Sequence, residues 1–174
     1  MTTYVRGFDT ATLRETVDLA AVESRLAELG GERSLSALGE RAGLLRVAGR
    51  LDEALEVATE AVKQARFDGE RERLAKARIR RALVLQYQGK LDAAIAEFTE
   101  CATEANGAGW TETEGYALEH RGKARFEQDR LDDAARDLND ALIIRIRDHA
   151  SPDLVDGTMF ALGVVLSLSD SRGS

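Results

Sequence analysis

Apolar and small residues recur along most of this chain at the three- and four-residue spacing of amphipathic helices. Leu51, Ala54, Ala58 and Ala61, for example, mark one face of a helix. The pattern predicts helices at about residues 12–29, 34–48, 51–67, 69–88, 91–106, 111–128, 131–148 and 152–168. Because the aromatic residues that favour strands make up only 5% of the chain, we expect an all-α fold.

One block of sequence occurs three times at a constant interval of 40 residues. The copies begin at Gly49, Gly89 and Asp129, and each has leucine two residues later, at positions 51, 91 and 131. Each leucine is followed three residues later by alanine, at positions 54, 94 and 134, which predicts close helix packing. Glycine accepts the positive φ of a tight turn, and aspartate is among the next most tolerant residues. The repeat therefore predicts a series of helix hairpins.

Two of the helix starts carry recognisable capping residues. Thr111 followed by Glu114 predicts a capping box, with Thr111 as the N-cap. Ser151 followed by Pro152 predicts an N-cap with proline at the first helical position. These signals place helix starts near residues 111 and 152.

The repeated block resembles the tetratricopeptide repeat family. The second copy fits the family pattern best, with Ala82, Gly89, Leu91, Ala94 and Phe98 in the characteristic positions. The resemblance covers residues 34–168, although the period here is 40 residues and the usual period is 34. In this respect the chain is similar to the longer-helix versions found in kinesin light chains and in bacterial peptide-sensing regulators.

The resemblance implies an architecture and a domain organisation. The expected fold is a right-handed superhelical array of antiparallel helix hairpins, a TPR-like α-solenoid. An N-terminal segment with a capping helix would occupy residues 1–33. Three repeats and a terminal helix of the first type would occupy residues 34–170. At 174 residues, a single domain is the default.

Composition narrows the classes of partner. The formal net charge is −7, which disfavours general affinity for nucleic acid or an anionic membrane. One cysteine cannot form an internal disulfide, and the N-terminus has no long apolar run typical of a secretion signal. The longest apolar stretch, residues 159–168, is shorter than a bilayer span. We therefore expect a cytoplasmic protein with no membrane partner.

The sequence offers little that suggests catalysis. His120 and His149 lie on different predicted elements, with no nearby cluster of metal-ligating residues. Cys101 occupies a small-residue position of the repeat, which predicts a buried and inert thiol. No serine lies in the local sequence typical of a hydrolase nucleophile. We expect no enzymatic activity, no metal and no cofactor.

In the tetratricopeptide repeat family, the first helix of each hairpin lines a concave surface on which peptides lie. Carried over by position, the resemblance implies a candidate peptide groove formed by Arg46, Lys76, Ile79, Arg80, Leu83, Tyr87, Tyr116, Glu119, Lys123 and Phe126. Residues 71–81 carry six basic side chains and one acidic one, which favours an acidic peptide. The alternative is that these cations pair with surrounding carboxylates and bind no ligand. The lysine and asparagine that bind chaperone tails are absent, because Gly39 and Gly43 occupy the matching positions.

The last predicted helix is apolar on nearly every side, which predicts burial on more than one face. The candidate oligomer interface consists of Met159, Phe160, Val164 and Leu166. Its partner would be a second copy, giving a homodimer, or another protein.

These observations lead to a functional hypothesis. We interpret the chain as a non-enzymatic scaffold or adaptor for protein–protein interaction that binds a protein or peptide in its groove. A regulatory or sensor subunit that binds a short signal peptide is the alternative. An enzyme or an RNA-binding protein fits poorly with the acidic charge and the low aromatic content.

Overall fold

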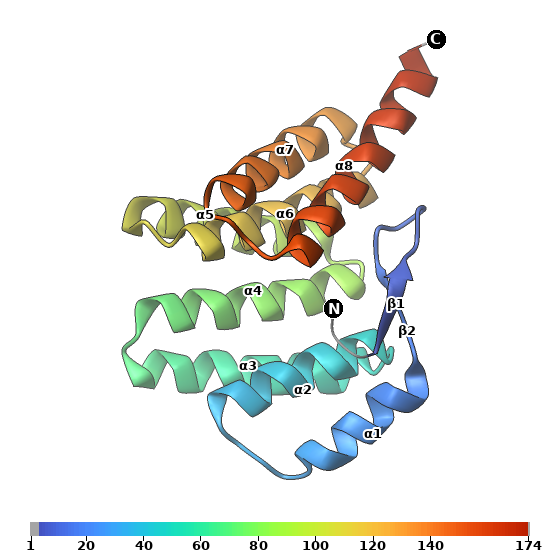
Figure 1. Cartoon of the computed structure of the whole chain (residues 1–174). Coiled ribbons are helices and arrows are strands. Elements are labelled where there is room, and N and C mark those ends of the chain that lie inside the picture. The colour runs from blue at the N-terminus through green and yellow to red at the C-terminus, as the bar shows by residue number, and fades with distance from the viewer. Residues whose placement is uncertain (1–3, 174) are drawn as a thin grey trace. The chain divides into compact units, whose positions relative to one another are not determined.

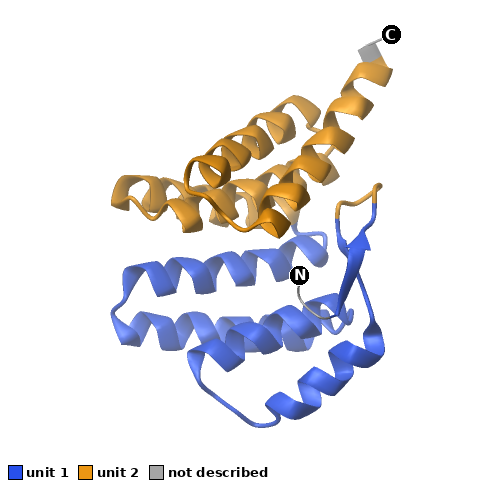
Figure 2. Cartoon of the chain, in the orientation of Figure 1, with its two compact units in different colours: residues 1–9, 14–90 blue, residues 10–13, 91–174 orange. Residues whose placement is uncertain are grey.

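The computed structural model describes residues 4–173, which form two compact units (Figure 2). Unit 1 contains residues 1–9 and 14–90, and unit 2 contains residues 10–13 and 91–174. Residues 10–13 are the tip of an N-terminal β-hairpin, and they belong to the second unit.

Unit 1 consists of a short hairpin and four helices (Figure 1). The elements are β1 (Val5–Phe8), β2 (Glu15–Val17), α1 (Leu19–Leu29), α2 (Leu35–Val47), α3 (Leu51–Asp68) and α4 (Arg71–Tyr87). Helix α3 packs against both α2 and α4, and α1 packs on α2. Small side chains allow the close contact of α2 with α3, because Ala42, Ala54 and Ala58 are buried in a shared core with Leu45.

Unit 2 consists of four further helices and the hairpin tip (Figure 1). The helices are α5 (Leu91–Ala108), α6 (Thr111–Glu127), α7 (Leu131–Arg147) and α8 (Pro152–Gly173). Helix α6 packs against α5 and α7, and α8 packs against α7. One core cluster includes Leu138 of α7, Val165 of α8, Phe126 of α6 and Leu13 of the hairpin tip.

The predicted all-α class and the predicted helix hairpins are confirmed. The N-terminal region differs, because β1 and β2 precede α1 and this helix begins at Leu19 instead of about residue 12. Asp18 is the N-cap of α1, and its carboxylate accepts a hydrogen bond from the backbone N–H of Ala21 at 3.1 Å. Strands of four and three residues are too short to show a two-residue alternation, so the pattern missed them.

The turns of the repeat have the predicted backbone geometry. Gly49, Gly89 and Asp129 have φ angles of 78°, 76° and 62°, and His149 occupies the same position in a further turn at 53°. In the first of these turns the N–H of Arg50 donates to the carbonyl of Leu45 at 2.9 Å. This bond satisfies a carbonyl that the end of α2 would otherwise leave unpaired.

Both helix starts were predicted correctly, but the capping box predicted for the first of them was wrong. Helix α6 begins at Thr111, its N-cap is Trp110, and no side chain caps it. The carboxylate of Glu114 instead accepts a hydrogen bond from the side-chain amide of Asn106 at 2.8 Å, so there is no capping box. Helix α8 begins at Pro152 as predicted.

Helix α8 continues to Gly173, beyond the predicted end at residue 168. Among the described residues it is the one helix long and apolar enough to cross a membrane by length and composition, with a mean hydropathy of 1.3. The apolar part of α8 is therefore longer than the run at residues 159–168 indicated. Thr158, Ala161 and Val165 of this helix are buried within unit 2, which makes α8 a packing element of the fold.

Helix α6 approaches α7 closely at Gly122. A Cβ atom there would lie 2.9 Å from Cγ of Leu138 and 3.2 Å from the carbonyl oxygen of Ala134. We expect Gly122→Ala to destabilise the protein by about 1–3 kcal/mol through overpacking. Gly163 of α8 has no atom within 4 Å of its Cβ position, so Gly163→Ala is the matched control and should stabilise by about 0.5–1 kcal/mol. Urea unfolding measures both, and equal effects would contradict the close approach.

Candidate functional site

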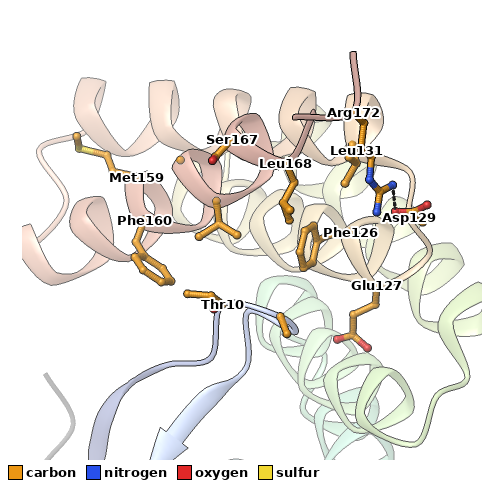
Figure 3. Close-up of a pocket in the computed structure, with 13 residues that line it drawn as sticks. Thr10, Phe126, Glu127, Asp129, Leu131, Met159, Phe160, Ser167, Leu168 and Arg172 are labelled. Atoms are coloured by element: carbon orange, nitrogen blue, oxygen red, sulfur yellow. Dashed lines mark hydrogen bonds and ion pairs between the residues drawn. The ribbon is translucent and has the colours of Figure 1, made fainter. Parts of the chain in front are cut away.

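A groove of about 890 Å³ runs along α8 in unit 2 (Figure 3). Its walls come from α8, from the end of α6 and the turn that follows it, and from the hairpin tip. The lining residues are Thr10, Ala11, Phe126, Glu127, Asp129, Leu131, Met159, Phe160, Gly163, Val164, Ser167, Leu168 and Arg172. A cleft of this volume is large enough for the side chains of a bound peptide or helix.

The long wall of the groove is an apolar row on α8. Phe160, Val164 and Leu168 recur at intervals of four residues and so lie along one side of the helix. Phe126 of α6 lies across from this row, and Thr10 of the hairpin tip lines the same groove (Figure 3). The groove thus presents a continuous apolar surface along about two turns of helix.

One end of the groove is polar. The guanidinium of Arg172 pairs with the carboxylate of Asp129 at 2.5 Å, and both side chains are more than half exposed. Such an exposed pair contributes little to stability, but it places both signs of charge beside the apolar surface. Asp129 therefore has two roles, since its positive φ also forms the turn between α6 and α7.

Three of the four residues predicted for an oligomer interface line this groove. They are Met159, Phe160 and Val164, and Leu166 is also exposed but lies outside the lining. Within the chain α8 is buried on one face, and burial of a second face by another copy or by a partner stays a prediction. Only 17% of the most apolar 18-residue stretch of α8 is buried, because α7 and its neighbours cover a single face.

The predicted groove residues of α6 lie in different environments. Phe126 lines the groove and is 9% exposed. Glu119 and Lys123 are instead buried and paired with each other at 2.5 Å, so they do not present a ligand surface. Tyr116 is half-buried, with its ring edge-on to His120 at 4.5 Å between centroids.

Glu119 is the centre of a buried network that positions α8. Its carboxylate also pairs with the guanidinium of Arg145 at 2.5 Å, and Arg145 donates to the carbonyl of Leu154 at 3.0 Å and to the hydroxyl of Thr158. Burial alone would raise the pKa of Glu119, but the charges of Lys123, His120 and Arg145 hold that pKa far below its usual range. The carboxylate therefore stays ionised within the fold.

In unit 1, two predicted groove residues contact the chain's own hairpin. The guanidinium carbons of Arg46 and Arg14 each lie 4.4 Å from the centroid of the Tyr87 ring. The carboxylate of Glu15 pairs with the guanidinium of Arg46 at 2.8 Å. Burial raises the pKa of Tyr87 above its usual range, with a smaller opposing effect from the charge of Arg46. We call the surface formed by Arg46, Tyr87 and the Gln86 carbonyl the Tyr87 surface.

The remaining predicted residues lie along α4. Ile79 and Leu83 are 0% and 3% exposed, so they present almost no surface. The ammonium of Lys76 pairs with the carboxylate of Glu72 at 3.0 Å, and the Arg80 guanidinium lies against Gly39 of α2. Binding of an acidic peptide to these cations stays a prediction.

Sequence reasoning missed the contribution of the hairpin tip and of the end of α8. Thr10, Ala11 and Arg172 lie far from the groove residues of α6 along the chain, and no repeat relates them. The signal that pointed toward the groove was the apolar character of α8, which the structure leaves exposed.

Comparison with known proteins supports the fold and leaves the family open. No protein-family model matches the chain, and no curated protein matches it. Among solved structures, the chain is similar to that of BtubC (BKLC) from P. vanneervenii, with a TM-score of 0.66 and 18% sequence identity. The likeness covers 87% of this chain and 65% of BtubC, so the chain spans less than two thirds of that protein. At this identity, the likeness shows a shared all-α helical-repeat fold.

Proposed function

We propose that this protein is a non-enzymatic interaction module that binds the apolar face of an amphipathic helix from a partner protein in the groove of unit 2. The observation that carries the proposal is the apolar row of α8, bordered by the Asp129–Arg172 pair. In this row Phe160 is exposed, and Val164 and Leu168 are partly exposed. An apolar centre with a polar rim is the usual composition of a protein interface.

The shape of the groove favours a helix as the occupant. Side chains four residues apart form ridges on a helix surface, and a second helix packs its own ridges between them. Phe160, Val164 and Leu168 form such a ridge, and Gly163 beside them leaves room for close approach. A partner helix would then bury apolar side chains at positions i, i+3, i+4 and i+7 against α8.

A charge placed in the groove tests this proposal. We expect Phe160→Glu to weaken binding of groove-selected helical peptides at least tenfold, because a carboxylate would be desolvated against the apolar row. Phe67→Glu is the matched control, since Phe67 of α3 is 82% exposed and lies in unit 1. Peptides selected from a displayed helical library against the wild type are titrated by fluorescence anisotropy against both variants.

The same measurements distinguish the identity of the occupant. If light scattering finds a wild-type dimer that only Phe160→Glu dissociates, a second copy of the chain fills the groove. If the wild type is monomeric and selected peptides depend on Phe160, the groove serves another protein. Selected peptides that bind Phe160→Glu as tightly as the wild type would contradict the proposal.

A further inference from the structure

The N-terminal hairpin contacts α2 and α4 of unit 1 through specific polar groups. Strand β2 lies against α2, where the carboxylate of Glu15 pairs with Arg46 at 2.8 Å. The preceding residue, Arg14, lies over the Tyr87 ring at 4.4 Å and donates to the backbone carbonyl of Gln86 at 3.3 Å. Two consecutive residues of opposite charge are therefore each matched by a complementary group.

These contacts are of the kind that recognise a peptide ligand. A tyrosine ring attracts a cation, and an arginine pairs with a carboxylate. Both interactions are lost if the arginine and the glutamate of the ligand exchange places. The Arg46 side chain is 10% exposed and that of Glu15 is 31% exposed, so the pair is partly shielded from water. The Tyr87 surface thus offers complementary groups to an arginine followed by a glutamate.

The hairpin that carries Arg14 and Glu15 has little stability of its own. Its strands have four and three residues, and their register is interrupted between Val5 and Gly7. A two-stranded hairpin of this length is at best marginally stable in water. Leu13, next to Arg14, has a positive φ of 57°, a conformation that is strained for leucine. The hairpin is therefore held by its contacts with the helices more than by its own pairing.

We propose that residues Arg14–Glu15 are a built-in ligand of the Tyr87 surface. The hairpin occupies this surface within the chain, and an extended segment of a partner protein with arginine followed by glutamate binds there when it displaces the hairpin. This surface lies in unit 1 and shares no residue with the groove proposed above. The tip of the same hairpin, however, lines that groove with Thr10 and Ala11, so displacement of the hairpin would also change the groove.

A peptide supplied in trans tests the inference. The probe is a fluorescent peptide of residues 9–18, and the protein is the full chain carrying Arg14→Ala with Glu15→Ala, which weakens the internal competitor. We expect this variant to bind the probe at least tenfold more tightly than the wild type does. A probe in which the arginine and glutamate exchange places should bind at least tenfold more weakly than the native probe. Adding Arg46→Gln to the variant should abolish binding.

Hydrogen exchange of the wild type provides a second test that needs no variant. Excess probe should accelerate exchange at Thr16 and Val17 of β2 while the amides of α4 stay protected. Equal binding of the native and exchanged probes, or unchanged exchange of β2 at millimolar probe, would overturn the inference. Probe binding that depends on Arg46 and on the order of the two charges belongs to the Tyr87 surface, so its outcome is distinguishable from that of the groove, which Phe160→Glu tests.

Discussion

Replacement of Glu119 by alanine is expected to lower the free energy of unfolding by about 3–5 kcal/mol. The carboxylate is 7% exposed and pairs with Lys123 and Arg145, which are themselves 9% and 7% exposed. Its removal would leave two buried cations without their shared anion, and this desolvation penalty is the source of the large effect. Because Arg145 also holds Leu154 and Thr158, the loss should extend to the docking of α8.

Chemical denaturation followed by circular dichroism measures this loss, with Glu100→Ala as the matched control. Glu100 is exposed on α5, so its removal changes the net charge equally without emptying a buried site. The control should change stability by less than about 0.5 kcal/mol. If the two variants unfolded at the same urea concentration, the network would not contribute as its geometry indicates.

The carboxylate of Glu119 also makes the free energy of unfolding depend on pH in the acidic range. The charges around Glu119 hold its pKa below that of an unfolded glutamate, which is about 4.3. The ion pairs therefore contribute fully above that pH, and their contribution is lost as the pH falls below it. Glu119→Gln removes the titrating group, so its stability should decline less steeply than that of the wild type below about pH 5.

Replacement of Asp137 by alanine is expected to have an effect of similar size, about 3–5 kcal/mol, at a second buried site. Asp137 of α7 is 4% exposed at its side chain and receives two hydrogen bonds from Arg121 of α6, at 2.7 and 2.9 Å. A third comes from Arg125 at 2.8 Å. Two guanidinium groups of α6 would lose their anion, which weakens the contact of α6 with α7.

A double-mutant cycle isolates this interaction from general damage to the fold. Arg121→Ala, Asp137→Ala and the double variant should give a coupling energy of about 1–3 kcal/mol. Asp140→Ala is the control on the same helix, because Asp140 is exposed. A coupling energy near zero would show that the bidentate pair adds nothing beyond the packing of its neighbours.

Part of the candidate site could be read from the sequence, and the reason is local. The apolar character of α8 is visible as a continuous run, and it directed attention to Met159, Phe160 and Val164. The opposite wall could not be read in the same way. Thr10 and Ala11 have no repeat partners and reach the groove through the β-hairpin, whose strands are too short to be detected by periodicity.

The peptide groove expected from the family resemblance shows a second limit of reading a site from sequence. Position in a repeat indicates which side of a helix a residue occupies, but it does not indicate how deeply the residue is covered. Glu119 and Lys123 lie four residues apart and resemble a solvated pair until Arg145 of α7 is placed beside them. Arg46 and Tyr87 resemble an open binding surface until the hairpin is placed against them.

The sequence by itself determined the helix hairpins and the turns that join them. Helical periodicity and the need for a positive φ at Gly49, Gly89 and Asp129 are properties of a few neighbouring residues, so they can be read without a fold. Only the tertiary structure decided which charged residues are buried, which apolar side of α8 stays exposed, and that the hairpin occupies the Tyr87 surface. Each of these depends on contacts between residues far apart in the chain, where burial and the pairing of charges, more than local preference, set the energy.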